Sequence, residues 1–234
     1  MRKYFSLLAL CFMVLSSYAE DGSRLWLRYT PCNQAEVVAP KSSPTIDIAV
    51  DELRKYWNGK KVSLQLLKDK SLGDGYSIEE QGDGTVNIAS STEVGLLYGT
   101  YGLLRMMFTH DKHHVSTIPT YGLRLLNHWD NPDGSIERGY AGKSIFKWFD
   151  LDENLLKQYA RANASIGING SVLNNVNASP KMLTRAYLEE VKKIADWFRP
   201  YGIKVYLSVN FGTPKALGDT KTADPLDKSV QRWW

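Results

Sequence analysis

The sequence is poor in cysteine, proline and glycine. Its 234 residues include two Cys, nine Pro and 18 Gly, which excludes a disulfide scaffold and a collagen-like or linker-dominated chain. An excess of one charge is also lacking, because 29 basic residues face 25 acidic ones, so no field that attracts nucleic acid is indicated. The 43% of hydrophobic residues is typical of a folded globular protein whose core comes from burial.

The most hydrophobic segment lies at the N-terminus. A basic start, Arg2-Lys3, precedes an apolar run over 4–15, and the small residues of Ser17-Tyr18-Ala19 follow. The run is shorter than the roughly 20 residues that a membrane-spanning helix needs. Residues 1–19 are therefore predicted to be a secretory signal peptide, and the mature protein is expected to be exported, periplasmic or extracellular, and free of the membrane.

Two other interpretations of this segment remain. One is an anchor that is retained. The other is a lipoprotein signal ending at Cys11, although the bulky Leu10 stands where a small residue is expected. Removal of the signal also removes Cys11, so Cys32 is left without an internal disulfide partner.

Residues 20–118 are predicted to form a small mixed α/β domain. Gln81-Gly82-Asp83-Gly84 indicates a hairpin turn between two strands, and Ser90 followed by Glu93 indicates a capping box at a helix start. The expected elements are strands over 25–29, 62–67, 76–80 and 85–89, and helices from Ser43-Pro44 to Asn58-Gly59 and from the capping box to Met107.

A polar loop over 109–120 is expected to mark the domain boundary. Its side chains His110, Asp111, His113 and His114 are of metal-ligating types, but their spacing fits no closed metal site and a solvated loop explains them equally well. No metal is predicted. No cofactor is predicted either, because no glycine-rich phosphate loop follows any expected strand.

Residues 119–234 follow a different rhythm, in which strands alternate with helices. Such alternation predicts a parallel sheet, because parallel neighbours need a long crossover connection. The expected elements are strands over 122–127, 168–173 and 203–209, helices over 152–163 and 184–199, and a further helix that begins at Asp227. Leu155, Leu156, Tyr159 and Ala160 are expected to share one side of the first helix, and Leu188, Val191, Ile194, Ala195 and Phe198 to form the buried face of the second.

The length of this second part predicts an incomplete (β/α)₈ TIM barrel. Such a barrel takes about 250 residues, whereas residues 121–234 provide only enough for about three βα units. The chain also ends on Trp233-Trp234, two large aromatic residues that a complete domain would bury. We therefore expect a partial chain. The alternative, a complete three-stranded domain, would leave two parallel-strand edges uncovered.

Polar and aromatic residues follow the first two expected strands of this part. In parallel α/β folds the functional groups gather at the carboxyl ends of strands. Amide and charged groups hydrogen-bond sugar hydroxyls, and an aromatic face packs against a sugar ring. The candidate substrate-binding residues are Trp129, Asp130, Asn131, Arg138, Asn174 and Asn175.

These loop residues also have structural explanations. Asn174, Asn175 and Asn177 fit the role of loop caps. Trp129 fits a packing role, and Asp133 lies in a strong turn sequence. Asp130 and Glu137 suggest an acid and base pair, yet carboxylates at this separation are common in loops. Arg138 fits a bidentate contact with an anionic substrate and equally an ion pair with either carboxylate.

These strand-end residues belong to stretches that resemble the glycoside hydrolase family 67 α-glucuronidases. The first domain, through Gly95-Leu96-Leu97-Tyr98-Gly99, is similar to the helper domain that precedes the barrel in this family and in some hexosaminidases. The stretches that carry the resemblance are Arg124–Asn131, Gly134–Ser144, Tyr159–Gly170, Val172–Ala178, Phe198–Ser208 and Lys221–Asp227.

The resemblance implies an exported enzyme that removes glucuronic acid, usually 4-O-methylated, from glucuronoxylan-derived oligosaccharides with inversion. It implies that Trp129 lies beside the uronate pocket and that Asn174-Asn175 forms part of the pocket wall. In the family the catalytic carboxylates lie on later barrel strands, so no catalytic residue is assigned and the fragment itself is expected to be inactive. Family members often form homodimers. The alternative function is a non-catalytic carbohydrate-binding protein that uses Trp129 and the strand-end asparagines.

Overall fold

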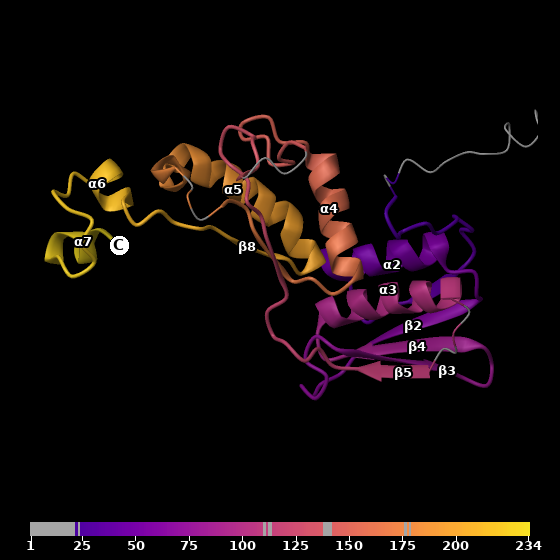
Figure 1. The fold of residues 1–234 in the computed structure, drawn as a ribbon. Helices are drawn as coiled ribbons and strands as arrows, with labels where there is room; N and C mark the ends of the chain where they lie inside the picture. The colour runs from indigo at the N-terminus through magenta and orange to yellow at the C-terminus, as the bar shows by residue number, and fades with distance from the viewer. Residues whose placement is uncertain are drawn as a thin grey trace, which may run out of the picture.

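The computed structural model describes residues 22, 24–109, 111, 114–137, 142–175, 177 and 179–234. The predicted signal peptide, His110, His113 and Arg138 lie outside these residues. The described chain forms a five-stranded sheet of order β1-β2-β4-β3-β5 and a three-stranded sheet of order β6-β7-β8. Each sheet with its helices is called a sheet unit below. Figure 1 shows the first sheet unit beside α4 and α5 of the second.

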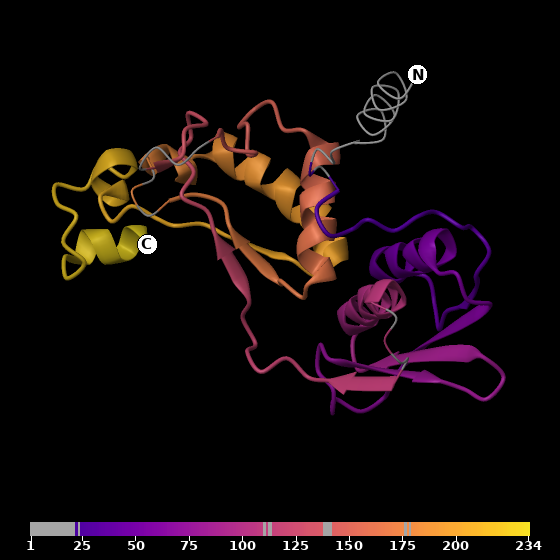
Figure 2. The ribbon, with the colours of Figure 1, turned by 45° about the vertical axis from the view of Figure 1, so that its right-hand side comes forward.

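The first sheet unit has two layers. Strands β1 (Glu36–Val38), β2 (Lys61–Leu66) and β4 (Thr85–Ser90) are parallel. Strand β3 (Tyr76–Glu80) runs antiparallel to β4 and to β5 (His114–Thr117). Helices α2 (Pro44–Tyr56) and α3 (Glu93–Thr109) cover one face of the sheet (Figure 2).

Helix α2 forms because its start, its periodicity and its end agree. The Ser43 hydroxyl accepts a hydrogen bond from the Ile46 amide at 3.2 Å, and proline stands at the first helical position. Ile46, Ala49 and Leu53 recur at helical spacing and are fully buried, so the helix packs through one apolar side.

Helix α3 lies close to the sheet because glycines face it. A Cβ atom on Gly99 would lie 2.5 Å from Ile88 Cγ2, and one on Gly102 would lie 2.6 Å from the Tyr76 hydroxyl. The predicted helix is confirmed but its cap is not Ser90. The Thr92 hydroxyl accepts from the Gly95 amide at 3.0 Å, whereas Ser90 donates to the Gly75 carbonyl.

Two expectations about the first sheet were wrong. Residues 25–29 form no strand: 24–26 are a turn, and Leu25 has a positive φ of 50°. The edge strand is instead β1, whose three residues are too few to show a periodicity. The loop expected over 109–120 contains strand β5, which joins the sheet by pairing with β3.

The second sheet unit alternates strands and helices as predicted. Strands β6 (Leu125–Asn127), β7 (Gly170–Val172) and β8 (Lys204–Tyr206) are all parallel. Helices α4 (Glu153–Ser165) and α5 (Arg185–Phe198) connect them. Their core consists of Phe146, Leu156, Ala160, Leu173, Ile194, Phe198 and Ile203.

The helix boundaries of this unit follow local signals. The Asp152 carboxylate accepts from the Leu155 amide at 3.0 Å and starts α4. After the short 3₁₀ turn η3 (Arg199–Tyr201), Gly202 adopts a φ of 73° and ends the helical stretch. Leu188 was expected on the buried face of α5, but it is 41% exposed.

The C-terminal segment extends away from the second sheet (Figure 1). It contains α6 (Thr213–Leu217), which the sequence did not predict, and the predicted α7 (Lys228–Trp233). The Asp227 carboxylate caps α7 by accepting from the Ser229 amide at 2.7 Å. A further 3₁₀ turn, η2 (Pro180–Leu183), precedes α5.

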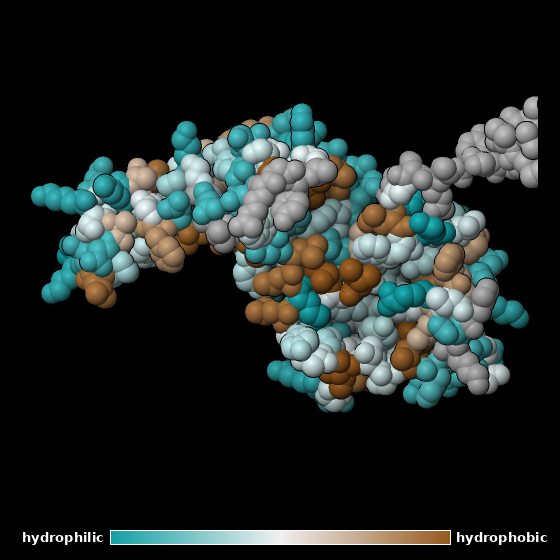
Figure 3. Space-filling model, in the orientation of Figure 1, coloured by the Kyte–Doolittle hydropathy of each residue, from teal (hydrophilic) through white to brown (hydrophobic). Residues whose placement is uncertain are grey.

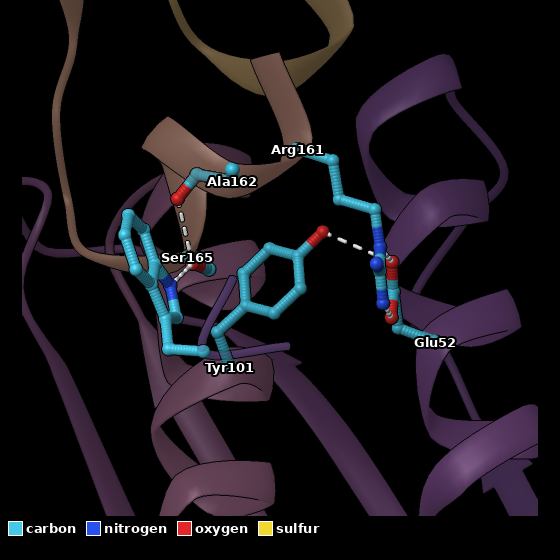
Figure 4. Close-up of polar contacts among 6 residues, drawn as sticks. Glu52, Tyr101, Arg161, Ala162 and Ser165 are labelled. Atoms are coloured by element: carbon cyan, nitrogen blue, oxygen red, sulfur yellow. Dashed lines mark hydrogen bonds and ion pairs between the residues drawn. The ribbon is translucent and has the colours of Figure 1, made fainter. Parts of the chain in front are cut away.

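A buried ion pair joins the two sheet units. Figure 4 shows Arg161 of α4 facing Glu52 of α2, with the Tyr101 hydroxyl of α3 directed at the same carboxylate. Arg161 Nη2 donates to Glu52 Oε2 at 2.8 Å, and Tyr101 donates to Oε1 at 3.1 Å. Burial opposes the charge on Arg161, but the hydrogen bond and the charge of Glu52 outweigh it and raise the pKa of the guanidinium. Trp26 adds a hydrogen bond from Nε1 to the Ser165 hydroxyl at 2.7 Å.

Hydrophobic side chains gather in the middle of the face drawn in Figure 3. Exposed apolar residues lie before and within β6: Tyr121 at 74% and Leu123 at 63% precede the strand, and Leu126 at 36% is its middle residue. No helix among the described residues has the length and apolar character to cross a membrane.

Candidate functional site

The loops after β6 and β7 meet at the carboxyl ends of the strands. The Asn175 backbone amide donates to the Asp130 carbonyl at 3.1 Å, and its side-chain amide donates to Asn131 Oδ1. Asp130 is 6% and Asn175 1% exposed. The structure therefore brings three of the sequence-predicted residues into direct contact.

Asn174 links the ends of β7 and β8. Its Nδ2 donates to the Ser208 carbonyl at 2.9 Å, and its Oδ1 accepts from the Ser208 amide at 3.0 Å. The side chain is 1% exposed, and both of its polar atoms are used within the protein. In this structure Asn174 holds two strand ends in register, as a backbone amide would.

Trp129 and Glu137 lie on the two sides of a narrow loop. The Glu137 amide donates to the Trp129 carbonyl at 2.8 Å, and an isolated antiparallel bridge joins Asp130 to Ile136. The Glu137 carboxylate accepts from Asn177 Nδ2 at 3.1 Å. Trp129 is half-buried. Arg138, which follows this loop, lies outside the described residues.

Asp133 has the turn role that the sequence favoured. Its carboxylate accepts from the Ser135 amide at 2.9 Å and from the Ser135 hydroxyl at 2.6 Å. These hydrogen bonds lower the pKa of the exposed Asp133 carboxyl. Gly134 follows with a φ of 84°, a conformation that favours glycine.

A chain of polar contacts runs beneath the loop. His128 Nδ1 lies 3.6 Å from Asp130 Oδ1, and His128 Nε2 lies 2.7 Å from the Tyr159 hydroxyl. That hydroxyl lies 3.1 Å from the Ser171 hydroxyl. Phe146 packs edge-on against the His128 ring, with centroids 4.9 Å apart. The imidazole is thus held from three sides.

The charge state of Asp130 follows from these contacts. Burial opposes ionisation, but hydrogen bonds from His128 and Ser144 outweigh it, so the pKa of Asp130 is lowered. Burial raises the pKa of Tyr159, so its hydroxyl stays protonated at neutral pH. Asp130 and Glu137, the suggested acid and base pair, contact different partners here. No sequence pattern singled out His128 and Tyr159 as partners, because Tyr159 comes from α4.

A cavity of about 700 Å³ opens beside this loop. Its lining includes Pro132 and Ile136 together with Lys143, Lys147 and Trp148. Trp148 packs against Tyr187 with ring centroids 5.6 Å apart. The cavity thus combines two ammonium groups with an aromatic wall. Residues 143–148 were missed because they lie between the expected elements.

A metal site in the boundary loop gains no support from the described side chains. Within the described part of the chain, no three His, Cys, Asp or Glu side chains are grouped to hold a metal ion. His110 and His113 lie outside that part, and His114 is an exposed residue of β5.

Comparison with known families decides which family this site belongs to. The model of the glycosyl hydrolase family 67 middle domain matches residues 104–234, which include the strand-end loops described above. The chain belongs to glycosyl hydrolase family 67. The resemblance inferred from the sequence is thereby confirmed.

Curated relatives of this family 67 chain carry the name "Probable alpha-glucuronidase A". The protein from Aspergillus clavatus is 37% identical over 100% of this chain and 33% of its own length. The protein from Neosartorya fischeri is 46% identical over 69% of this chain and 20% of its own length. The chain thus spans at most about a third of these relatives.

Solved structures share the fold at low sequence identity. A GH138 enzyme targeting pectin rhamnogalacturonan II gives a TM-score of 0.55 at 15% identity. The similarity covers 74% of this chain and 24% of that one.

Proposed function

We propose that this chain is the N-terminal part of an inverting α-glucuronidase. The enzyme would release glucuronic acid or its 4-O-methyl ether from xylo-oligosaccharides during xylan degradation. The observation that carries the proposal is the family 67 match over residues 104–234, together with the names of relatives that are 36–46% identical.

The proposed organisation is a helper domain over residues 20–118 and the first part of a (β/α)₈ barrel over 119–234. Support comes from the three parallel strands β6, β7 and β8 and the crossover helices α4 and α5 between them. Such barrels carry their active sites at the carboxyl ends of the strands, which is where Asp130, Asn131, Asn174 and Asn175 converge.

We assign these four residues a supporting role in substrate binding. The three asparagine side chains bond to one another, to Ser135 and to the backbone of neighbouring loops. The Asp130 carbonyl accepts from the Asn175 amide, and the Asp130 carboxylate bonds to His128 and Ser144. They would fix the loops that present Trp129 and Arg138 to a sugar. An aromatic face suits the apolar side of a pyranose, and a guanidinium suits a carboxylate. Lys143 and Lys147 add positive charge beside Trp148, which favours an acidic sugar over a neutral one.

The proton-transfer groups are proposed to come from a part of the enzyme outside these residues. Inversion needs a carboxylic acid and a carboxylate about 6.5 to 9.5 Å apart, with room for water between them. Asp130 is bound to His128 and Ser144, Asp133 to Ser135, and Glu137 to Asn177. None of the three is assigned as acid or base.

Export to the periplasm or the extracellular space is proposed from the N-terminal sequence. Export would suit this substrate class, because large xylan fragments lie outside the cell. A homodimeric parent enzyme is proposed by analogy with the family, through regions beyond those described here.

The test is hydrolysis of aldouronic acids by the complete polypeptide that contains this chain. We expect release of free glucuronic acid or its 4-O-methyl ether, and proton NMR of the first product should show the β anomer. Calorimetry with the same oligosaccharides separates the alternative, because binding without turnover would identify a non-catalytic carbohydrate-binding protein. The absence of both binding and turnover would refute the proposal.

A further inference from the structure

A second cavity lies between the two sheet units, and the proposed function does not explain it. It has a volume of about 230 Å³. Arg124 immediately precedes β6 and Gly167 shortly precedes β7, so the cavity lies at the amino ends of these strands. The candidate carbohydrate site lies at their carboxyl ends. The two features are therefore on opposite ends of the sheet.

Arg124 points an unused donor into this region. Its Nε donates to the Gly167 carbonyl at 2.5 Å, and its Nη1 donates to the Tyr121 carbonyl at 2.7 Å. Its Nη2 is buried and has no hydrogen-bond partner among the described residues. An unpaired buried guanidinium nitrogen is costly, because it has lost its hydration without replacement.

Tyr98 supplies a second unused donor. The side chain is 5% exposed, and its hydroxyl is buried with no partner in the described part of the chain. The Arg124 guanidinium carbon lies 5.8 Å from the centroid of its ring. Burial, assisted by Asp74 and opposed by Arg124, raises the pKa of Tyr98 to about 12. The hydroxyl therefore remains a donor at neutral pH.

The charged groups that line the cavity leave a positive excess. Arg105 faces it from α3 while its Nη1 donates to the Ser165 carbonyl at 3.0 Å. Asp74 is the acidic group among the described lining residues, and it accepts from the Thr92 hydroxyl at 3.0 Å. Two guanidinium groups thus face one carboxylate, so the site favours an anion over a cation or a neutral molecule.

We propose that this cavity binds a small oxyanion, such as phosphate, sulfate or a carboxylate, through Arg124 Nη2 and the Tyr98 hydroxyl. Arg105 would contribute charge at the mouth. The volume exceeds the roughly 30 Å³ that one water occupies in the liquid, so an oxyanion and several waters fit. The lining residues come from both sheet units, so a bound anion would link them and stabilise the folded chain.

Thermal unfolding of the full chain tests the proposal. Phosphate, sulfate and acetate are titrated separately at constant ionic strength, with chloride as the reference. We expect a saturable rise of the unfolding temperature with at least one oxyanion, and the ranking of the three distinguishes the oxyanion class that the cavity prefers. Crystals soaked in selenate should show an anomalous peak within hydrogen-bond distance of Arg124 Nη2.

Matched variants separate binding from general stability. Tyr98→Phe removes the buried hydroxyl and keeps the ring, so the chain should fold and its anion affinity should fall about tenfold or more. Thr100→Val is the control, because the Thr100 hydroxyl is also buried and unpartnered among the described residues but does not line the cavity. It should leave the affinity unchanged. Arg124→Lys is a further variant that keeps the charge and should weaken binding.

The proposal is overturned if no oxyanion raises the unfolding temperature above the chloride reference. It is also overturned if Tyr98→Phe and Thr100→Val respond equally to the anions, since the anion effect would then not depend on the Tyr98 hydroxyl. Either result leaves the glucuronidase proposal intact, because that proposal rests on the opposite end of the sheet.

Discussion

Asn174 and Ser208 exchange two hydrogen bonds, one in each direction, between the ends of adjacent strands. The Asn174 side chain donates to the Ser208 carbonyl and accepts from the Ser208 amide. This relationship ties β8 to β7 beyond the three paired residues of the ladder. The loops of the candidate site depend on this link, because the next residue in the chain, Asn175, contacts Asp130 and Asn131.

Replacement of Asn174 is therefore expected to destabilise the second sheet unit. Asn174→Ala leaves the Ser208 backbone groups without these partners, and we expect a loss of about 2–4 kcal/mol in the free energy of unfolding. Denaturant titration measures it. Asn154→Ala is the control, since Asn154 is an exposed α4 residue, and a similar loss in both variants would contradict the role assigned to Asn174.

Replacement of Glu52 is expected to loosen the contact between the sheet units. Glu52→Gln leaves Arg161 without its buried counter-charge, and we expect a loss of about 3 kcal/mol. Glu153→Gln removes an exposed pair with Lys157, whose atoms are 2.6 Å apart, and should cost less than about 1 kcal/mol. Hydrogen exchange should show faster exchange along α2 and α4 in the first variant. Equal protection in both variants would contradict this assignment.

The start of α3 should depend on Thr92. Thr92→Val removes the hydroxyl that accepts from the Gly95 amide and donates to Asp74, and we expect a loss of about 1–2 kcal/mol. Thr109→Val, at the other end of the same helix, is the control because its hydroxyl makes exposed hydrogen bonds. Denaturant titration compares the two, and a larger effect at Thr109 would show that Thr92 is not the cap.

Asp130 is expected to make the folded chain sensitive to acid. Its pKa is lower in the folded state than in the unfolded state, so its contribution is complete above the unfolded value of about 3.9. The contribution is lost as the pH falls from there through the lower folded pKa. Asp130→Asn should therefore reduce the free energy of unfolding at pH 7. The free energy of unfolding of this variant should also fall less steeply as the pH decreases from about 5 to about 3. Unfolding curves at several pH values measure this dependence. The same dependence below about pH 5 in the variant and in the original chain would contradict the prediction.

The two lysines of the larger cavity should favour acidic sugars. Under the proposed function, Lys143→Met with Lys147→Met should raise KM for aldouronic acids several-fold with a smaller change in kcat, because uniform binding is lost. Lys157→Met, on the exposed side of α4, is the control. An unchanged KM in the double variant would remove the cavity from the substrate site without affecting the family assignment.

Much of the fold was readable from local patterns. Ser43-Pro44 predicted the start of α2, Asp152 lies at the start of α4, and Gly202 ends the stretch after α5. These signals act within one turn of the chain, so the sequence carries them completely. The alternation of strands and helices after residue 121 likewise predicted that β6, β7 and β8 are parallel.

The errors arose where long-range pairing decided the outcome. β1 and β5 are short edge strands that exist through their partners β2 and β3, whereas 25–29 form no strand. The cap of α3 moved from Ser90 to Thr92 because the Ser90 hydroxyl bonds the distant Gly75 carbonyl. The secondary-structure propensity of a short segment does not show which distant residues will pair with it or bond to it.

The sequence by itself determined the family and the types of residue at the strand ends, because both are written in contiguous stretches. Only the tertiary structure decided what those residues contact. Asn174 and Asn175 hold loops together, His128 meets Tyr159 of α4, and Arg124 faces Tyr98 across the two sheet units. Each of these contacts joins residues at least 26 positions apart, a distance that folding alone can close.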